Sequence, residues 1–368
     1  MSLADLASAV ERIGREAGLD AVGIALAAPF EATRRTLERR KAEGLHGGMQ
    51  FTYRNPARST DPSQALPGAR ALVVGARSYR RQDGEPPPAG RGAVARYSWI
   101  DHYQPLRRAL EAVAAELRRS GWQARVLADD NALVDREAAH RAGLGFYGKN
   151  TNLLLHGGRG SEFVLGSVVT DAPLPTTTTP DPDDTGEGCG SCTRCLPACP
   201  TGALVEPGVL DARRCLAWLL QAEGDFPVEH RRALGGRIYG CDACQEACPP
   251  NRLEIRRRPP PPAESGAEPE VDLVALLATV DDDELLRRYG RWYIANRDAR
   301  YLRRNALVAL GNVGNGHDRA TQEVLRAHLL RDDDPMLRSH AAWAAAELDG
   351  CRHLVDERPE LGGVATPR

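Results

Sequence analysis

The cysteines have the spacing that most clearly indicates chemistry in this sequence. Eight of the nine lie between residues 189 and 248, which favours a metal site over a disulfide framework. The first run, CGSCTRCLPACP, has gaps of two, two and three residues and ends in proline; it contains Cys189, Cys192, Cys195 and Cys199. In bacterial ferredoxins with this spacing, the first three thiolates bind one 4Fe-4S cluster and the fourth binds a second cluster.

A second run, CDACQEACP, supplies three more cysteines, and Cys215 is the remaining thiol nearby. Two complete ligand sets follow: one is Cys189, Cys192, Cys195 and Cys248, and the other is Cys199, Cys215, Cys241 and Cys244. Two zinc sites with four thiolates each would use the same eight residues, but usually as paired knuckles. The consecutive four-cysteine run followed by proline favours iron-sulfur clusters. Cys351 is predicted to be an inert thiol of the C-terminal tail.

The elements around the cysteines predict an α/β domain, a cluster module and an all-helical tail. Apolar periodicity indicates helices over 3–17 and 105–120, strands over 20–26, 71–79 and 122–129, and a hairpin formed by 152–156 and 162–170. A parallel or mixed sheet is expected. Segments without periodicity, 172–188 and the prolines of 259–262, separate three predicted domains, which span 1–175, 176–258 and 271–368.

The tail contains a weak internal repeat. LRRNALVAL at 302–310 and LRSHAAWAA at 337–345 superpose with a shift of 35 residues, and both present small alanines at helical spacing. Closely stacked helix pairs of the HEAT type use such residues, whereas an ordinary helical cap is the plainer alternative.

Hydropathy and net charge limit where the protein can be located and which partners it can bind. No apolar stretch approaches the roughly 18 residues of a membrane span, and the N-terminus has no signal-peptide pattern, so a cytoplasmic protein without a membrane partner is expected. With a net charge of −2, a polyanion must be held by a local patch. Residues 287–304 carry seven arginines against Asp298, with aromatic residues between them. This mixture predicts an RNA contact, and a solvated helix face with inward aromatics is the alternative.

Three acids and a glycine-rich turn mark the domain ahead of the cysteines. In LADDNALVDREAAHRAGLGFYGKNTNLLL, Asp129, Asp130 and Asp135 lie around a strand end, and GLGFYGKN offers backbone amides to an anionic group. The chain has 46 arginines but only two lysines, at 41 and 149. Such a bias suggests that a compact ammonium is required at Lys149, although a chance lysine is the alternative.

Together with the two-cluster arrangement, three segments carry a family resemblance: LHGGMQFTYRNPARSTDPSQALPGARALVV, DREAAHRAGLGFYGKNTNLL and YLRRNALVALGNVG. Over nearly the whole chain the sequence resembles epoxyqueuosine reductases. The resemblance implies a cobalamin-dependent enzyme with two 4Fe-4S clusters that performs the last step of queuosine formation at the tRNA wobble base. The implied fold class is α/β + α: a nitroreductase-like α/β cobalamin domain, a ferredoxin-like two-cluster module and a C-terminal HEAT-like helical domain.

The resemblance also implies roles for single residues. Asp129, seven residues ahead of Arg136, matches the family's catalytic acid, with Asp130 as the neighbouring candidate. A strand-end carboxylate that merely caps the next helix is the structural alternative. Arg136, Lys149 and Asn150 match positions expected to face cobalamin, although Arg136 could equally be a surface charge at a helix N-terminus.

One departure from the family pattern concerns the substrate. Where the family usually has Asp and His, the segment RYSWIDHYQ has His102 and Gln104. This leaves room for a cobalamin and iron-sulfur reductase of a small oxygenated or halogenated molecule. A plain electron-transfer module would leave most of the chain unexplained. The expected partners are tRNA with a modified wobble base and an unidentified reductant protein, and a monomer is expected.

Overall fold

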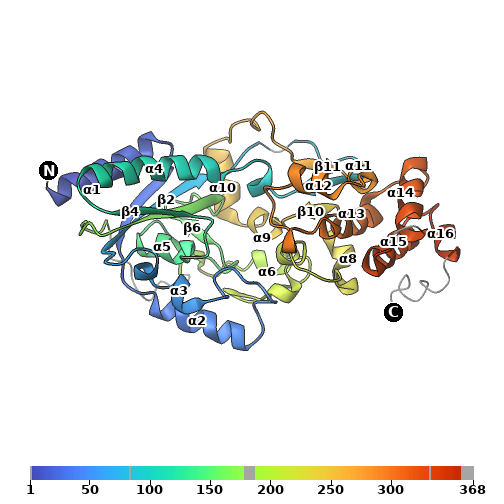
Figure 1. Cartoon of the computed structure of the whole chain (residues 1–368), viewed down its shortest axis with the longest axis horizontal. Coiled ribbons are helices and arrows are strands. Elements are labelled where there is room, and N and C mark those ends of the chain that lie inside the picture. Colours follow the sequence, from blue (N-terminus) through green and yellow to red (C-terminus); the bar gives the residue numbers. More distant parts are fainter. Residues whose placement is uncertain (1, 83, 178–186, 331–332, 358–368) are drawn as a thin grey trace. The chain divides into compact units, whose positions relative to one another are not determined.

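The computed structural model describes residues 2–82, 84–177, 187–330 and 333–357. The chain forms two compact units whose segments alternate along the sequence: unit 1 comprises 1–82, 101–212 and 243–262, and unit 2 comprises 83–100, 213–242 and 263–368 (Figure 1). This division differs from the three consecutive domains predicted above. The cysteine-rich segment is shared between the units because the apolar residues of 213–242, such as Leu216 and Phe226, belong to the core of unit 2.

Unit 1 is built on a four-stranded sheet in the order β1-β2-β7-β4, and all of its pairings are antiparallel. The expected parallel or mixed sheet is therefore wrong for this unit. The long helix between β2 and β4 suggested a parallel crossover, but β7 inserts between these two strands and runs antiparallel to both. The strands of this sheet are β1 Ala21–Leu26, β2 Ala71–Ser78, β4 Ala124–Ala128 and β7 Phe163–Thr170.

Two small hairpins accompany this sheet: β5 Gly145–Tyr147 with β6 Leu153–Leu155, and β8 Leu204–Glu206 with β9 Val209–Leu210. The predicted hairpin of 152–156 with 162–170 is wrong, because β6 pairs with β5 and meets the next segment only through the bridge between Leu155 and Gly160. β7 is buried along most of its length and occupies a central position in the large sheet.

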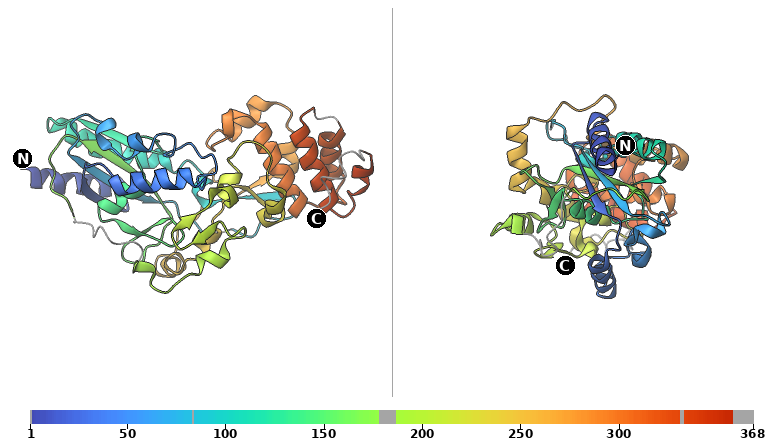
Figure 2. Two further views of the ribbon diagram at one scale, coloured as in Figure 1. Left: turned by 90° about the horizontal axis from the view of Figure 1, so that it is seen from below. Right: turned by 90° about the vertical axis from the view of Figure 1, so that its left-hand side faces the viewer.

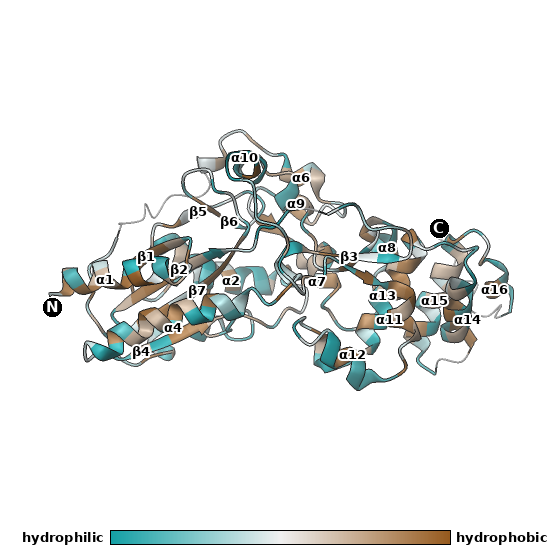
Figure 3. Ribbon diagram, turned by 90° about the horizontal axis from the view of Figure 1, so that it is seen from above, coloured by the Kyte–Doolittle hydropathy of each residue, from teal (hydrophilic) through white to brown (hydrophobic). Residues whose placement is uncertain are grey.

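Helices α1 and α4 pack against each other and on the sheet of unit 1 (Figure 1). A capping box between Ser2 and Asp5 begins α1. In Figure 3, α4 carries both hydrophobic and hydrophilic residues, as an amphipathic helix on a sheet requires. The helices of unit 1 are α1 Leu3–Glu16, α2 Glu31–Ala42, α3 Pro56–Ser59, α4 Tyr103–Arg119, α5 Asp135–Arg141, α6 Cys195–Ala198, α9 Ala243–Glu246 and α10 Pro249–Arg257.

Unit 2 combines a small mixed sheet with a set of helices (Figure 2). Strand β3 Arg91–Val94 runs parallel to β10 Arg237–Tyr239 and antiparallel to β11 Glu270–Asp272. The helices are α7 Leu216–Leu219, α8 Val228–Leu234, α11 Leu273–Ala278, α12 Asp282–Arg288, α13 Arg300–Val313, α14 Arg319–Leu330, α15 Pro335–Glu347 and α16 His353–Asp356. None of the described helices combines the length and apolar character needed to span a membrane.

The two repeat segments form α13 and α15, which pack against each other. Ala306 and Ala341 are fully buried, and a side chain at Gly311 would collide with Trp343 and Ala344. Small residues therefore allow the close approach that the repeat predicted.

The arginine-rich segment 287–304 is not a single helix. Asn296 and Arg297 have left-handed backbone angles between α12 and α13, so the arginines of this segment are divided between two helices and the turn that joins them. Tyr289 and Trp292 stack on each other within the core of unit 2, with ring centroids 4.8 Å apart. Arg304 is fully buried and donates to the carbonyl oxygens of Leu219, Ala222 and Gly224. These rings and Arg304 are structural, and they cannot bind RNA without unfolding the core.

Candidate active site

A cavity of about 1170 Å³ lies in unit 1. This volume exceeds the usual range of pockets for drug-sized ligands. Its wall is formed by α2 and the following loop, the end of β4, α5, the turn between β5 and β6, and β7 together with the β8–β9 hairpin. Asp129, Arg136 and Lys149, all singled out from the sequence, line this one cavity. Asn150 does not belong to the lining.

Asp129 follows β4 directly and has a left-handed backbone, with φ of 54°. The preceding carbonyl of Ala128 accepts a hydrogen bond of 2.9 Å from Arg107. No side chain caps the N-terminus of α5, so the alternative of a simple helix cap does not hold for Asp129. Partial burial raises the pKa of Asp129; Arg107 opposes this rise, and the carboxyl groups of Asp101 and Asp130 add to it. Such an environment favours the protonated, proton-donating form.

Two further carboxyl groups line the same wall. Asp130 uses Oδ1 to accept a hydrogen bond from the amide of Ala132, which stabilises the turn after β4. Asp135 begins α5, and burial together with the charges of Asp129 and Asp130 raises its pKa well above the usual value, while Arg136 opposes the shift. The three acids predicted to surround the strand end therefore do gather at the cavity.

The three residues expected to face a cofactor have different surroundings. Arg136 is exposed at the cavity and donates to the carbonyl of Thr151 at 2.6 Å. Lys149 lines the cavity, and its Nζ donates to the carbonyl of Gly190 at 2.6 Å. Asn150 is buried, with Oδ1 accepting from the amide of Asn152, while its Nδ2 has no hydrogen-bond partner among the described residues.

Four cysteine thiols gather in unit 1. The pKa of Cys248 is raised to about 11 by burial and by the nearby thiols of Cys189, Cys195 and Cys192. The pKa of Cys195 is likewise raised by burial and by the nearby thiols of Cys189 and Cys192. These four residues are the first predicted ligand set. Among the described residues, no three His, Cys, Asp or Glu side chains are grouped so as to hold a single metal ion.

Cys199 has a different environment. Burial alone would raise its pKa, but hydrogen bonds from the amides of Thr201, Leu204 and Ala203 lower it; the Ala203 amide lies 3.1 Å from the sulfur. Cys199 and Cys244 belong to unit 1, whereas Cys215 and Cys241 belong to unit 2, and this second set stays a prediction. Cys351 is buried, and its thiol donates to the carbonyl of Gly316.

Sequence comparisons identify relatives of the cysteine module and of the whole chain. Residues 188–251 match the family model of the 4Fe-4S double cluster binding domain. An epoxyqueuosine reductase from Bacillus cereus is 33% identical over 90% of this chain and 86% of its own, and one from Xanthomonas campestris is 35% identical over 93% and 96%. The chain belongs to the epoxyqueuosine reductase family. It is therefore an oxidoreductase.

Solved structures of epoxyqueuosine reductases have the same fold. One with a tRNA-Tyr epoxyqueuosine-modified tRNA stem loop has a TM-score of 0.83 at 28% identity, covering 99% of this chain and 100% of that one. The enzyme from Bacillus subtilis, with an aspartate-bearing catalytic loop swung out of the active site, has a TM-score of 0.82 at 28% identity, and the match covers 98% of this chain and 100% of that one.

Several cavity residues of this epoxyqueuosine reductase family member were not found from the sequence. Arg40 lies on α2, and His46 lies on the loop that follows it. Arg40 Nε and His46 Nδ1 are both buried and have no hydrogen-bond partner among the described residues. On α5, Glu137 accepts from the hydroxyl of Tyr147 and from Arg141. Arg40 lies outside the segments that carry the family resemblance. His46 lies within LHGGMQFTYRN, and Glu137 and Tyr147 lie within DREAAHRAGLGFYGKN, but their spacing alone does not indicate a cavity, which the three-dimensional fold shows.

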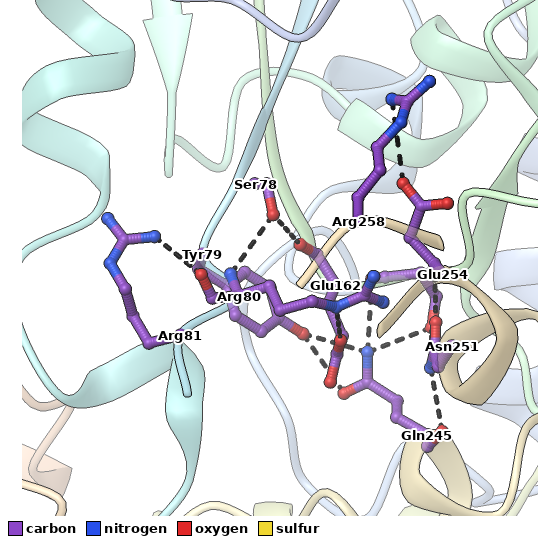
Figure 4. A network of polar contacts seen from close by, with 10 residues as sticks. Ser78, Tyr79, Arg80, Arg81, Glu162, Gln245, Asn251, Glu254 and Arg258 are labelled. Carbon is purple, nitrogen blue, oxygen red and sulfur yellow. Dashed lines mark hydrogen bonds and ion pairs between the residues drawn. The ribbon is translucent and has the colours of Figure 1, made fainter. Parts of the chain in front are cut away.

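A buried polar network holds the segment around Cys248 to the sheet of unit 1 (Figure 4). Gln245 donates to the hydroxyl of Tyr79 and to Ser161, and its carbonyl accepts from the side chain of Asn251 at 2.8 Å. The amide of Cys248 donates to the same carbonyl. Ser161 in turn donates its amide to Asn251 Oδ1 at 2.7 Å. Because buried polar groups are costly when unpaired, this network fixes the backbone of Cys248.

The departures from the family pattern lie outside the cavity lining. His102 is buried, with its ring 5.9 Å from that of Tyr79. Gln104 accepts a hydrogen bond from Arg108 on the outer surface of α4. Their neighbour Tyr103 does line the cavity. Neither His102 nor Gln104 therefore contributes a side chain to the wall of this site.

Proposed function

We propose that this chain reduces epoxyqueuosine to queuosine at the wobble position of tRNA, using cobalamin in the cavity of unit 1 and electrons relayed by two 4Fe-4S clusters. Family membership over nearly the full length supports the reaction. The observation that carries the proposal is the contact of Lys149, whose ammonium binds the carbonyl between Cys189 and Cys192. This contact supports the proposal because it joins the loop between Cys189 and Cys192 to a residue of the cavity that Asp129 also lines.

The cavity fits a large cofactor rich in amide and phosphate groups. Its volume of about 1170 Å³ is larger than a small substrate requires. Arg40 Nε and His46 Nδ1 are buried at its wall without hydrogen-bond partners among the described residues. Buried polar atoms need partners, and a polar cofactor supplies them. Arg136, Lys149 and these two residues would hold cobalamin, which supplies the carbon-centred reducing chemistry that no side chain provides.

Conversion of an epoxide to an alkene consumes two electrons and two protons and releases the oxygen as water. The chain's own contribution is to move single electrons through the clusters and to deliver protons. Asp129 is placed for proton delivery because it lines the cavity and because its raised pKa favours the acid form. The Bacillus subtilis enzyme has a catalytic loop named for an aspartate, which supports this assignment. Asp130 is the neighbouring alternative.

The decisive experiment is incubation of the anaerobically reconstituted protein, with added cobalamin, with tRNA that contains epoxyqueuosine. We expect queuosine in the nucleoside digest by mass spectrometry, at a level that depends on a chemical reductant. Omission of cobalamin is the matched control and should abolish the product. If cobalamin is bound and both clusters are reduced but epoxyqueuosine persists, the substrate assignment is wrong and a small oxygenated or halogenated substrate takes its place.

We further propose that exposed arginines of unit 2 contact the tRNA. Arg287 on α12 is exposed and has no ion-pair partner among the described residues, whereas Arg300 is paired with Asp298 and Asp334. We expect Arg287→Gln to weaken tRNA binding and to reduce the slope of log affinity against log salt by about one. Arg319→Gln, on the exposed start of α14, is the control. Equal affinities and slopes for parent and Arg287→Gln would remove α12 from the RNA interface.

A further inference from the structure

Lys149 connects the cavity to the first cysteine run and to the hairpin that follows it. Its Nζ donates to the carbonyl of Gly190 at 2.6 Å, and its own carbonyl accepts from the amide of Gly208 at 2.9 Å. Gly190 lies between the first two cysteines, and Gly208 lies in the turn between β8 and β9, which follows the run. One residue therefore ties two parts of the cysteine module to the turn between β5 and β6.

Hydrogen bonds and close packing restrain the backbone of the turn that contains Lys149. The amide of Thr151 donates to the carbonyl of Gly148, and Gly148 donates to the carbonyl of Asn152. A side chain at Gly148 would collide with Leu154, and Thr151 has a left-handed φ of 66°. The base of the lysine side chain is therefore fixed, and its reach to Gly190 follows from the fold.

The ammonium of Lys149 forms no direct ion pair among the described residues, and its described side-chain hydrogen bond is to a neutral carbonyl. A four-iron cube with four thiolate ligands is anionic and gains a further negative charge on reduction. A fixed positive charge beside such a cluster favours the reduced state, because net charge and hydrogen bonding set the potentials of iron-sulfur centres.

We propose that Lys149 is a positioning residue for the cluster bound by Cys189, Cys192, Cys195 and Cys248, where it holds the Cys189–Cys192 loop at the cavity wall and raises the cluster's reduction potential. This inference rests on the cluster assignment made in the proposed function. It changes the role of Lys149 from a cofactor contact alone to a residue that makes electron delivery to the cavity favourable.

The test is a potentiometric titration of the anaerobically reconstituted full chain, followed by electron paramagnetic resonance. We expect Lys149→Met to retain both clusters and to shift one of them to a lower potential. The expected shift corresponds to a roughly tenfold change in the reduction equilibrium, about 59 mV for one electron. Lys149→Arg keeps the charge and should restore most of the potential. Lys41→Met is the matched control, because Lys41 is the other lysine and also donates to a backbone carbonyl.

Unchanged potentials in a fully loaded Lys149→Met would overturn the inference. If that variant also lost cobalamin affinity, Lys149 would be a cofactor contact only. If Lys149→Met does not assemble its clusters, Lys149→Gln serves instead, and parent-like potentials in that variant would likewise overturn the inference. The titration needs neither substrate nor cobalamin, so a parent that holds two clusters but leaves tRNA unchanged would refute the proposed function without affecting this result.

Discussion

Replacement of Asp129 by asparagine is expected to reduce turnover of epoxyqueuosine by at least about 10²-fold, the lower end of what a positioned general acid contributes. The amide keeps the size of the side chain but cannot donate a proton to the departing oxygen. Iron content and cobalamin uptake should match the parent. Asp130→Asn is the matched control, because an asparagine Oδ1 can still accept from the amide of Ala132. Quantitation of queuosine in single-turnover reactions measures both variants.

The raised pKa of Asp129 also predicts how turnover and stability depend on pH. The raised pKa of Asp129 means that its protonated form persists to higher pH than in a free aspartate. Parent turnover should therefore fall as pH rises through that pKa, and the residual activity of Asp129→Asn should lose this dependence. Ionisation of a carboxyl with a raised pKa destabilises the folded state, so the variant should be at least as stable as the parent at neutral pH. Parent-like turnover in Asp129→Asn would transfer the role to Asp130 or to water.

Replacement of Cys248 by alanine is expected to remove one cluster and abolish turnover. Cys248 lies among Cys189, Cys192 and Cys195, and a 4Fe-4S cluster normally needs four ligands. Iron should fall from about eight to about four atoms per chain, because the other cluster keeps its ligands. Cys351→Ala is the matched control, since Cys351 is also buried but stands apart from the cluster motifs. Iron and sulfide analysis with electron paramagnetic resonance distinguishes these results.

Retention of about eight iron atoms in Cys248→Ala would show that another residue completes the first ligand set. Loss of both clusters would show that the two sites assemble together. In that case, Asn251→Ala is the variant to test. It leaves all eight thiols in place but removes side-chain hydrogen bonds near Cys248, so it shows whether the order of the backbone around Cys248 controls cluster assembly.

Local patterns predicted much of unit 1 correctly. The strands at 21–26, 71–78 and 124–128 and the helices at 3–16 and 103–119 lie where apolar periodicity placed them. Strand direction was not predictable in this way. β7 pairs with β2 and β4, which lie about 90 and 40 residues earlier in the sequence, so its place depends on contacts that no local window contains.

The site shows the same distinction between motif and fold. Asp129, Arg136 and Lys149 belong to one segment of ordered spacing, and the structure places them at one cavity. Arg40 reaches that cavity from an ordinary polar helix, and His46 from the loop that follows it; although His46 lies in a segment that carries the resemblance, the positions of both residues depend on tertiary packing. The arginine-rich segment shows the reverse case. Its composition is typical of an RNA-binding surface, but Arg304 and Trp292 are needed to fill the core of unit 2.

The alternation of the two units along the chain has a consequence for biosynthesis. During translation, residues 1–212 emerge with Cys189, Cys192 and Cys195, but Cys248 and the Gln245–Asn251 network follow only after the 213–242 insertion. Domains fold largely as units while the ribosome adds residues from the N-terminus. With the predicted ligand set of Cys189, Cys192, Cys195 and Cys248, the nascent chain presents three of the four thiols for some time, and the first cluster is expected to be completed only after residue 248 has left the exit tunnel.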